Sequence, residues 1–322
     1  MKRVTKIFVL AGLPVLLGGW GFHAHRQINR LAVFTLPPPL IQFYKKHIDY
    51  ITEASVNPDR RRFAVPDEAP RHYIDIDHFG DSAVYKMPRK WEDAVALYSE
   101  DTLKAYGILP WHLPVVYYRL RDAFFVRDAE AILRLSADLG HYVADAHVPL
   151  HTTENYNGQF TGQEGIHAFW ESRVPELLSA SYDFWVGSAT YETDVRKRVW
   201  SAIVQAHEAV DSVLRIEREL SEKFGERKYS FETRGRQTVR VYSREFAMAY
   251  HQALNGMVQR QMRAAIRMLG DLWFSAWVDA GQPDVQLLLR YTPSEQELEQ
   301  RKKLLEEWKN GRLKVREHEG DF

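Results

Sequence analysis

The stretch Gly140-His141-Tyr142-Val143-Ala144-Asp145-Ala146-His147-Val148-Pro149-Leu150-His151 concentrates histidines and a carboxylate inside a helical pattern. Asp128 is a suitable N-cap, and apolar side chains then recur with helical spacing at Ile132, Leu135, Leu139 and Val143. His141 and Asp145 are four residues apart, so they share one helix face, away from that apolar stripe. Pro149 disfavours helical backbone at Val148, which ends the helix and lets His151 turn back toward the same face.

The spacing of these groups indicates a metal site. An imidazole and a carboxylate one helical turn apart, with a second imidazole just past the helix end, suit a hard-to-borderline metal such as zinc. The segment His167-Ala168-Phe169-Trp170-Glu171 repeats the four-residue spacing of a nitrogen donor and an oxygen donor. The alternative is a polar helix face on which each histidine makes ordinary hydrogen bonds.

The composition narrows the class of protein. The 322 residues include 43 basic side chains (Lys and Arg) and 43 acidic ones (Asp and Glu). The chain therefore has no net charge that would favour binding to nucleic acid or to an anionic membrane. A phosphate ligand is compatible with that balance, because bound metal ions can be the largest charges in a site. The chain has no cysteine, so disulfides and a thiol nucleophile are excluded, and any zinc would be held by nitrogen and oxygen ligands.

Residues 1–19 are predicted to be a cleaved signal peptide. A basic start is followed by an uncharged stretch over residues 7–19, which is too short to span a bilayer comfortably. Cleavage would export the protein to the periplasm or the medium and would make Trp20 its first residue. An uncleaved anchor is the alternative. No membrane span is expected after cleavage, and no obligate protein partner is implied.

The remaining chain is expected to form one all-α domain, residues 20–288, followed by a charged helical tail, residues 289–322. No strand is expected, and residues 52–82 are expected to form an ordered loop. Thr292-Pro293-Ser294-Glu295 predicts a capping-box start for a tail helix, which either binds a partner or docks through a thin apolar stripe. Helices are expected over residues 26–34, 41–51, 90–106, 112–126, 129–146, 194–224, 241–269 and 295–309, and around His167.

Seven metal-ligating side chains are distributed over these elements, more than the three or four ligands that one zinc takes. A multinuclear site follows if these side chains converge in space. They are Asp59, His72, His141, Asp145, His151, His167 and Glu171.

On these motifs the chain resembles the superfamily of zinc-dependent phospholipase C and the S1/P1 nucleases, which are all-helical trinuclear-zinc phosphodiesterases. The resemblance rests on His-x3-Asp-x5-His followed by His-x3-Glu, after an Asp and a His in a loop. It covers Trp20 to about Glu171. In that family the mature chain begins with Trp, whose amino group and carbonyl bind a zinc, so cleavage before Trp20 would create a ligand that the precursor lacks.

The resemblance implies three zinc ions and assigns their ligands. Trp20 and His25 would hold one metal together with Asp145. Asp59, His72, His141 and Asp145 would hold a second metal, which makes Asp145 a bridge. His151, His167 and Glu171 would hold the third.

The chemistry of such a site is hydrolytic. Clustered zinc ions lower the pKa of a bound water toward about 7, which supplies a nucleophile at neutral pH. Their residual positive charge favours a phosphodiester and the charge that develops on it. Asp59 is the candidate for orienting or deprotonating the attacking water in addition to binding metal. Asp75 and Asp77 are candidates for fixing imidazole tautomers, or for capping the loop.

The substrate is predicted, by a narrow margin, to be a phospholipid head group and not single-stranded nucleic acid. Glu171 as the last ligand, the lack of cysteine and the short interval from His151 to His167 resemble the phospholipase branch. The five-residue step from Trp20 to His25 resembles the nuclease branch. Tyr73 would stack on a base in a nuclease, or pack in the core. Two other classes are a zinc-stabilised protein that binds phosphate without hydrolysing it and a structural helical protein that binds no metal.

Overall fold

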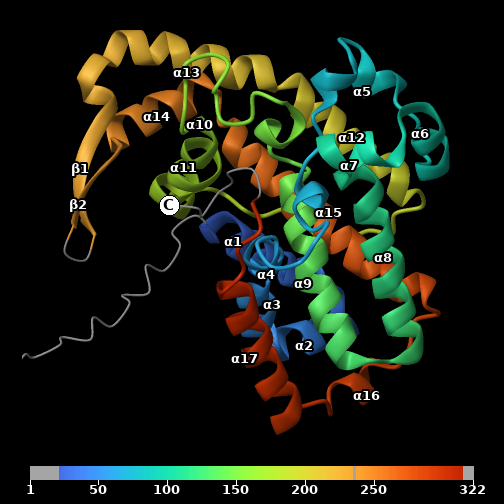
Figure 1. Ribbon diagram of the computed structural model, residues 1–322. Coiled ribbons are helices and arrows are strands. Elements are labelled where there is room, and N and C mark those ends of the chain that lie inside the picture. The colour runs from blue at the N-terminus through green and yellow to red at the C-terminus, as the bar shows by residue number, and fades with distance from the viewer. Residues whose placement is uncertain (1–21, 235–236, 315–322) are drawn as a thin grey trace, which may run out of the picture.

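A computed structural model describes residues 22–234 and 237–314 of the chain (Figure 1). The predicted signal peptide, residues 1–19, and Trp20 lie outside the described residues. Among the helices that are described, none combines the length and apolar character that a bilayer crossing requires.

The described residues are mostly helical, as the sequence predicts. The α-helices are α1 His23–Ala32, α2 Pro38–Lys46, α3 Ile48–Ala54, α4 Asn57–Arg61, α5 Ala83–Lys86, α6 Trp91–Tyr98, α7 Glu100–Tyr106, α8 Leu109–Val126, α9 Ala129–Asp145, α10 Ile166–Ala168, α11 Val174–Leu178, α12 Val195–Glu208, α13 Val210–Phe224, α14 Arg244–Ala253, α15 Met257–Asp279, α16 Val285–Leu288 and α17 Glu295–Lys309. Short 3₁₀ turns are η2 Val33–Thr35, η3 Ala69–His72, η4 Ile76–Phe79, η5 Pro149–Thr152, η7 Ser179–Ser181 and η8 Gly225–Lys228, and η6 Phe169–Arg173 is a π-helical turn.

One β-hairpin corrects the expectation that the chain has no strands. β1 Tyr229–Arg234 pairs antiparallel with β2 Gln237–Tyr242, and Tyr229 lies opposite Tyr242. Aromatic and β-branched residues are frequent in both segments, which favours strands. The pairing of Phe231 with Arg240 places the aromatic side chains of β1 and the valines of β2 on opposite faces of the hairpin. The helix expected from residue 241 therefore begins later, at Arg244, where the Ser243 hydroxyl accepts a hydrogen bond from the amide of Phe246 at 3.2 Å.

Three expected helices are each divided into two. The helix expected over residues 90–106 breaks at Ser99, whose φ of 68° ends α6 while its side chain caps α7. The helix expected over 241–269 breaks at Asn255 and Gly256, which both have positive φ. The helix expected over 194–224 is interrupted at Ala209, between α12 and α13. In each case a local backbone turn outweighs a continuous apolar pattern.

Helix α9 lies at the centre of the molecule, in contact with α1, α3, α8 and α15 (Figure 1). It begins at the predicted N-cap Asp128, whose carboxylate accepts a hydrogen bond from the Ala131 amide at 3.0 Å, and it ends at Asp145 before Pro149. Every residue from Leu135 to Asp145 is buried. Its polar face is therefore not a solvated surface, and the histidine and aspartate on it need partners inside the protein.

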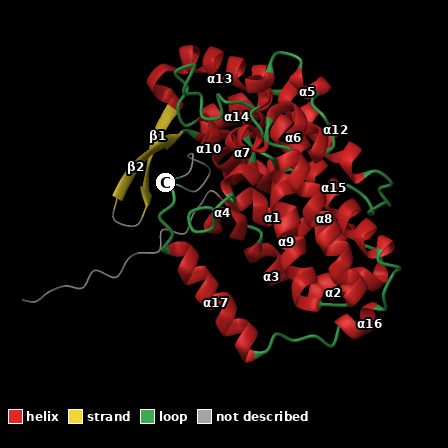
Figure 2. Cartoon of the chain, turned by 45° about the vertical axis from the view of Figure 1, so that its right-hand side comes forward, coloured by secondary structure: helices red, strands yellow, loops and turns green. Residues whose placement is uncertain are grey.

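Helix α17 is separate from this core. The predicted capping box is present: the Ser294 side chain accepts from the Glu297 amide, and the Glu297 carboxylate accepts from the Ser294 amide. No residue of α17 is buried. The helix runs along the outside of the body, beside the end that carries α2, α3 and α4 (Figure 2). Its contacts with the body agree with docking through a thin stripe.

Candidate metal centre

The structure brings together all the predicted metal-ligating side chains that lie within the described residues. They come from α1, α4, η3, α9, η5, α10 and η6, and each is almost completely buried. They are His25, Asp59, His72, His141, Asp145, His151, His167 and Glu171. Three groups of these residues can each hold a metal ion.

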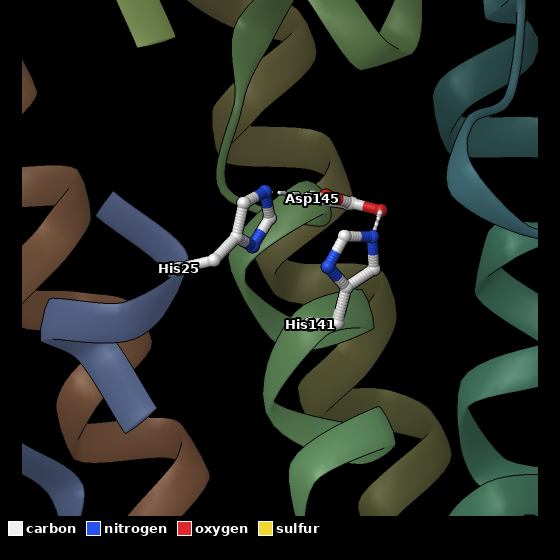
Figure 3. Close-up of side chains that lie close together, drawn as sticks. All are labelled: His25, His141 and Asp145. Carbon is white, nitrogen blue, oxygen red and sulfur yellow. Dashed lines mark ion pairs between the residues drawn. The ribbon is translucent and has the colours of Figure 1, made fainter. Parts of the chain in front are cut away.

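The first group joins α1 to α9 (Figure 3). His25 Nε2 lies 3.6 Å from Asp145 Oδ1, and His141 Nε2 lies 3.4 Å from Asp145 Oδ2. The two imidazoles stack with their centroids 4.2 Å apart. This approach requires Gly140, because a Cβ at Gly140 would lie 2.2 Å from Asn29 Oδ1 on α1.

The second group adds the loop between α3 and α5. His72 Nδ1 lies 3.0 Å from His141 Nε2, and each of these nitrogens lies 3.6 Å from Asp59 Oδ1. His72 Nδ1 also lies 3.1 Å from Asp145 Oδ2. Asp145 therefore directs one oxygen toward His25 and the other toward His72 and His141, which is the geometry of a bridging carboxylate.

The third group follows Pro149. Glu171 Oε2 lies 3.2 Å from His151 Nε2 and 2.9 Å from His167 Nε2. Its other oxygen, Oε1, lies 3.2 Å from His25 Nε2, which connects this group to the first. Glu171 is in the π-helical turn η6, a distortion that is frequent at functional sites. The three groups therefore form one continuous cluster.

Hydrogen bonds fix the tautomers of three of these histidines. The Nδ1–H groups of His141, His151 and His167 donate to backbone carbonyls at 2.9, 2.5 and 3.2 Å respectively, those of Ser55, His72 and Tyr156. Burial lowers the pKa of His141 well below its usual value and that of His151 to about 4, so both rings are neutral near pH 7. Their Nε2 atoms are then acceptors that face carboxylate oxygens, which are also acceptors. A cation between them satisfies both, so the donor set fits a metal.

The buried carboxylates of the cluster also require a positive charge close to them. Burial, together with the negative charges of Glu171 and Asp59, raises the pKa of Asp145 well above its usual value. Burial alone would also raise the pKa of Glu171, but His151, His167 and His25 outweigh it and lower that pKa well below its usual value. Buried carboxylates this close repel one another unless positive charge is present. With nitrogen and oxygen donors only, the set suits zinc.

The sequence interpretation missed a buried network behind His72. Glu68 accepts from Arg61 Nε at 3.0 Å and from the Tyr142 hydroxyl, and its Oε1 lies 3.8 Å from His72 Nε2. Arg61 also binds Asp138 at 3.0 Å. The signal available was the four-residue spacing from Glu68 to His72, the same spacing as in the two helix pairs.

The structure also shows the surroundings of Asp77 and Tyr73, for each of which the sequence left two roles open. Asp77 accepts from the Thr153 hydroxyl at 2.6 Å and from the Glu154 amide at 2.9 Å, so it caps the segment after η5. Tyr73 is buried, and a Cβ at Gly107 would lie 2.6 Å from its ring. Its ring packs in the core and offers no stacking surface for a base.

A narrow pocket reaches the cluster beside His25 and Glu171. Its other walls are mostly apolar and come from α1, α9 and α15, with Trp170 beside Glu171. Its volume is about 20 Å³, which has room for roughly one water molecule beside the candidate metal ligands.

The fold and the site thus define a mostly helical protein with three adjoining groups of buried histidine and carboxylate donors. Comparison with models of protein families gave no match, and a search of curated proteins gave none either.

Proposed function

We propose that the protein is a zinc-dependent hydrolase of phosphodiesters. The observation that supports this most directly is the shared use of ligands: Asp145 and Glu171 each direct their two oxygens to different groups of imidazoles. Shared carboxylates hold metal ions close together, as two-metal hydrolases require. The resemblance of the motifs to the phospholipase C and S1/P1 nuclease superfamily points to the same chemistry.

The residues divide into three candidate ligand sets. Asp145 with His25 and His141 forms one, Asp59 with His72 and His141 another, and Glu171 with His151 and His167 the third. His141 thus borders two sets, whereas the sequence interpretation gave it to one. Trp20, if cleavage makes it the first residue, would complete the set that contains His25. Zinc held there supplies positive charge for the phosphodiester and acidifies water.

Asp59 is the proposed general base. It is buried at the edge of the cluster, and its Oδ1 faces His72 and His141. A carboxylate held there would orient the attacking water and accept its proton. A positioned base of this kind contributes about 10²–10⁴-fold to the rate.

A phospholipid is the favoured substrate class. The preference rests on the motif resemblance, because Glu171 as the last ligand, the lack of cysteine and the short interval from His151 to His167 resemble the phospholipase branch. The pocket beside His25 and Glu171 has mostly apolar walls, but its volume of about 20 Å³ has room for roughly one water. The buried ring of Tyr73 removes the one base-stacking candidate. The S1/P1-type alternative, cleavage of single-stranded nucleic acid, still has the spacing from Trp20 to His25 in its favour.

The experiment is side-by-side turnover of a phospholipid panel and single-stranded DNA or RNA, with and without chelator. Wild-type protein beginning at Trp20 is compared with Asp59→Asn, and Asp77→Asn is the matched control because Asp77 caps a loop. We expect chelator-sensitive release of diacylglycerol that falls about 10²-fold or more in Asp59→Asn. Nucleotide release alone would assign the protein to the nuclease branch. Bound zinc without turnover of either substrate would contradict the enzymatic proposal and favour a phosphate-binding protein.

A further inference from the structure

A second cavity lies on the other side of α4, between the body and α17. This cleft has a volume of about 690 Å³, within the roughly 300–1,000 Å³ of small-molecule sites. Helix α17 covers it without filling it, since no α17 residue is buried. The helix is held at its end by a hydrogen bond from the Leu313 amide to the Phe63 carbonyl at 2.9 Å, and along its length by an ion pair from Arg301 to Glu130 at 3.3 Å.

The lining of the cleft is basic. Arginines reach it from five elements, α4, η3, α8, α9 and α17, and those that line it are Arg60, Arg61, Arg71, Arg119, Arg134 and Arg301. Four carboxylates also line it, Glu53, Glu68, Glu130 and Asp138. Each of the four already forms an ion pair with Arg26, Arg61, Arg71 or Arg301.

Three of the arginines that line the cleft form no ion pair with a carboxylate that the structure describes. Within the described residues, Arg60, Arg119 and Arg134 form no ion pair, and Arg60 donates only to the side-chain oxygen of Asn57, at 3.2 Å. The cleft therefore presents guanidinium groups that are suited to bidentate contacts with phosphate.

The rest of the lining is apolar and aromatic. Tyr50 lies beneath Arg301, whose guanidinium carbon is 4.3 Å from the ring centroid. Leu135 of α9 and Leu304 and Trp308 of α17 also line the cleft. A ligand that matches both parts of the lining carries an anionic group on an apolar or aromatic body.

We propose that this cleft binds a small molecule with a phosphate group on an apolar or aromatic body. The cleft contains none of the candidate metal ligands, although Arg61, Glu68 and Tyr142, which line it, also lie behind His72. The proposal does not depend on the proposed hydrolysis. The arginines without carboxylate partners would hold the phosphate, and the side chains of α17 would cover the remainder. A nucleotide and a short-chain lipid phosphate share this chemistry.

The test is calorimetric titration of the zinc-loaded protein with three probes: inorganic phosphate, adenosine monophosphate and dihexanoyl phosphatidic acid below its micelle concentration. We expect one organic probe to bind, and its identity distinguishes the two sources. Binding should weaken about tenfold or more in Arg119→Gln/Arg134→Gln, because charge-assisted hydrogen bonds are lost. Arg215→Gln, which changes an exposed arginine on α13, is the matched control and should bind normally. Leu304→Trp, which fills the cleft from the exposed helix, should also weaken binding.

The metal cluster is itself a possible phosphate site, so the titration is repeated with His151→Ala. Retained affinity in His151→Ala together with loss in the arginine variants supports the cleft. Loss in His151→Ala with no change in the arginine variants would place the ligand in the metal cluster and overturn the proposal. Lack of binding of all three probes at millimolar concentration would also overturn it, whatever the outcome of the hydrolysis assay.

Discussion

Gly140 controls how closely α1 approaches α9. Its Cα faces the Asn29 amide so tightly that a Cβ would lie 2.2 Å from Oδ1. We expect Gly140→Ala to cost about 1–3 kcal/mol of unfolding free energy, because overpacking forces the helices apart. The same shift should weaken zinc binding through His25. Urea unfolding and zinc titration measure the two effects.

A second substitution tests whether the clash with Asn29 causes the loss of stability in Gly140→Ala. Asn29→Ala removes the group that the new methyl meets, so the double variant should recover part of the stability lost in Gly140→Ala. Non-additivity of this kind is expected for residues in contact. Purely additive losses would show that the two residues do not limit the approach of the helices.

Glu68 is predicted to position His72. Its carboxylate is 1% exposed and binds Arg61, Arg71 and Tyr142. Glu68→Gln should lower zinc affinity about 10–100-fold, the usual effect of losing a group that orients a metal-binding histidine. Competition with a chromogenic chelator measures that affinity. Glu53→Gln, which changes an exposed carboxylate, is the control. Equal zinc affinities in the two variants would show that Glu68 does not position His72.

His47 provides a test by pH. Burial, together with the charges of Lys46 and Arg301, lowers its pKa from the ordinary value of 6.5 to about 4. The unfolded state therefore binds the proton more tightly, and stability is full above about pH 6.5 and falls as the pH drops toward 4. His47→Gln should make the loss of stability between pH 7 and pH 5 smaller. Lys45→Gln, which titrates nothing in this range, should leave the pH dependence as in wild type.

Among the secondary-structure elements, α17 tests whether the tail belongs to the cooperative core. Ser294→Ala removes the capping box and should destabilise α17 locally by about 1 kcal/mol. Because no residue of α17 is buried, the thermal midpoint should hardly change. Hydrogen exchange of the amides of residues 296–300 should speed up while exchange in α9 stays slow. A lower midpoint with faster exchange in α9 would show instead that α17 supports the core.

The elements also show how far the sequence is informative. Caps and breakers are local, so the start of α9 at Asp128, its end before Pro149 and the capping box of α17 could be predicted. The break at Ser99 has no comparable signal, because serine does not favour positive φ. The break at Asn255 could have been predicted, because Asn255-Gly256 is a turn-forming pair. The hairpin lies almost wholly in the gap between the expected helices 194–224 and 241–269, and its short strands were not predicted.

At the scale of the whole molecule, the candidate ligands could be named from the sequence but their convergence could not. His25 and Glu171 are far apart in the chain, and their contact depends on how α1, α9 and η6 pack. Sequence spacing shows which residues share a helix face, as with His141 and Asp145. It does not show that Glu68 lies behind His72, or that arginines from separate elements meet beneath α17.

Native mass spectrometry of the purified protein beginning at Trp20 counts the metal ions that the buried cluster holds. We predict a zinc content that approaches three per chain and falls in His151→Ala, but not in His207→Ala, a half-buried histidine bonded to the Thr152 carbonyl. Chelation should then lower the thermal midpoint, since zinc binds only the folded state tightly. A protein that folds and holds no metal, with a midpoint that chelator leaves unchanged, would show that the cluster is not a zinc site.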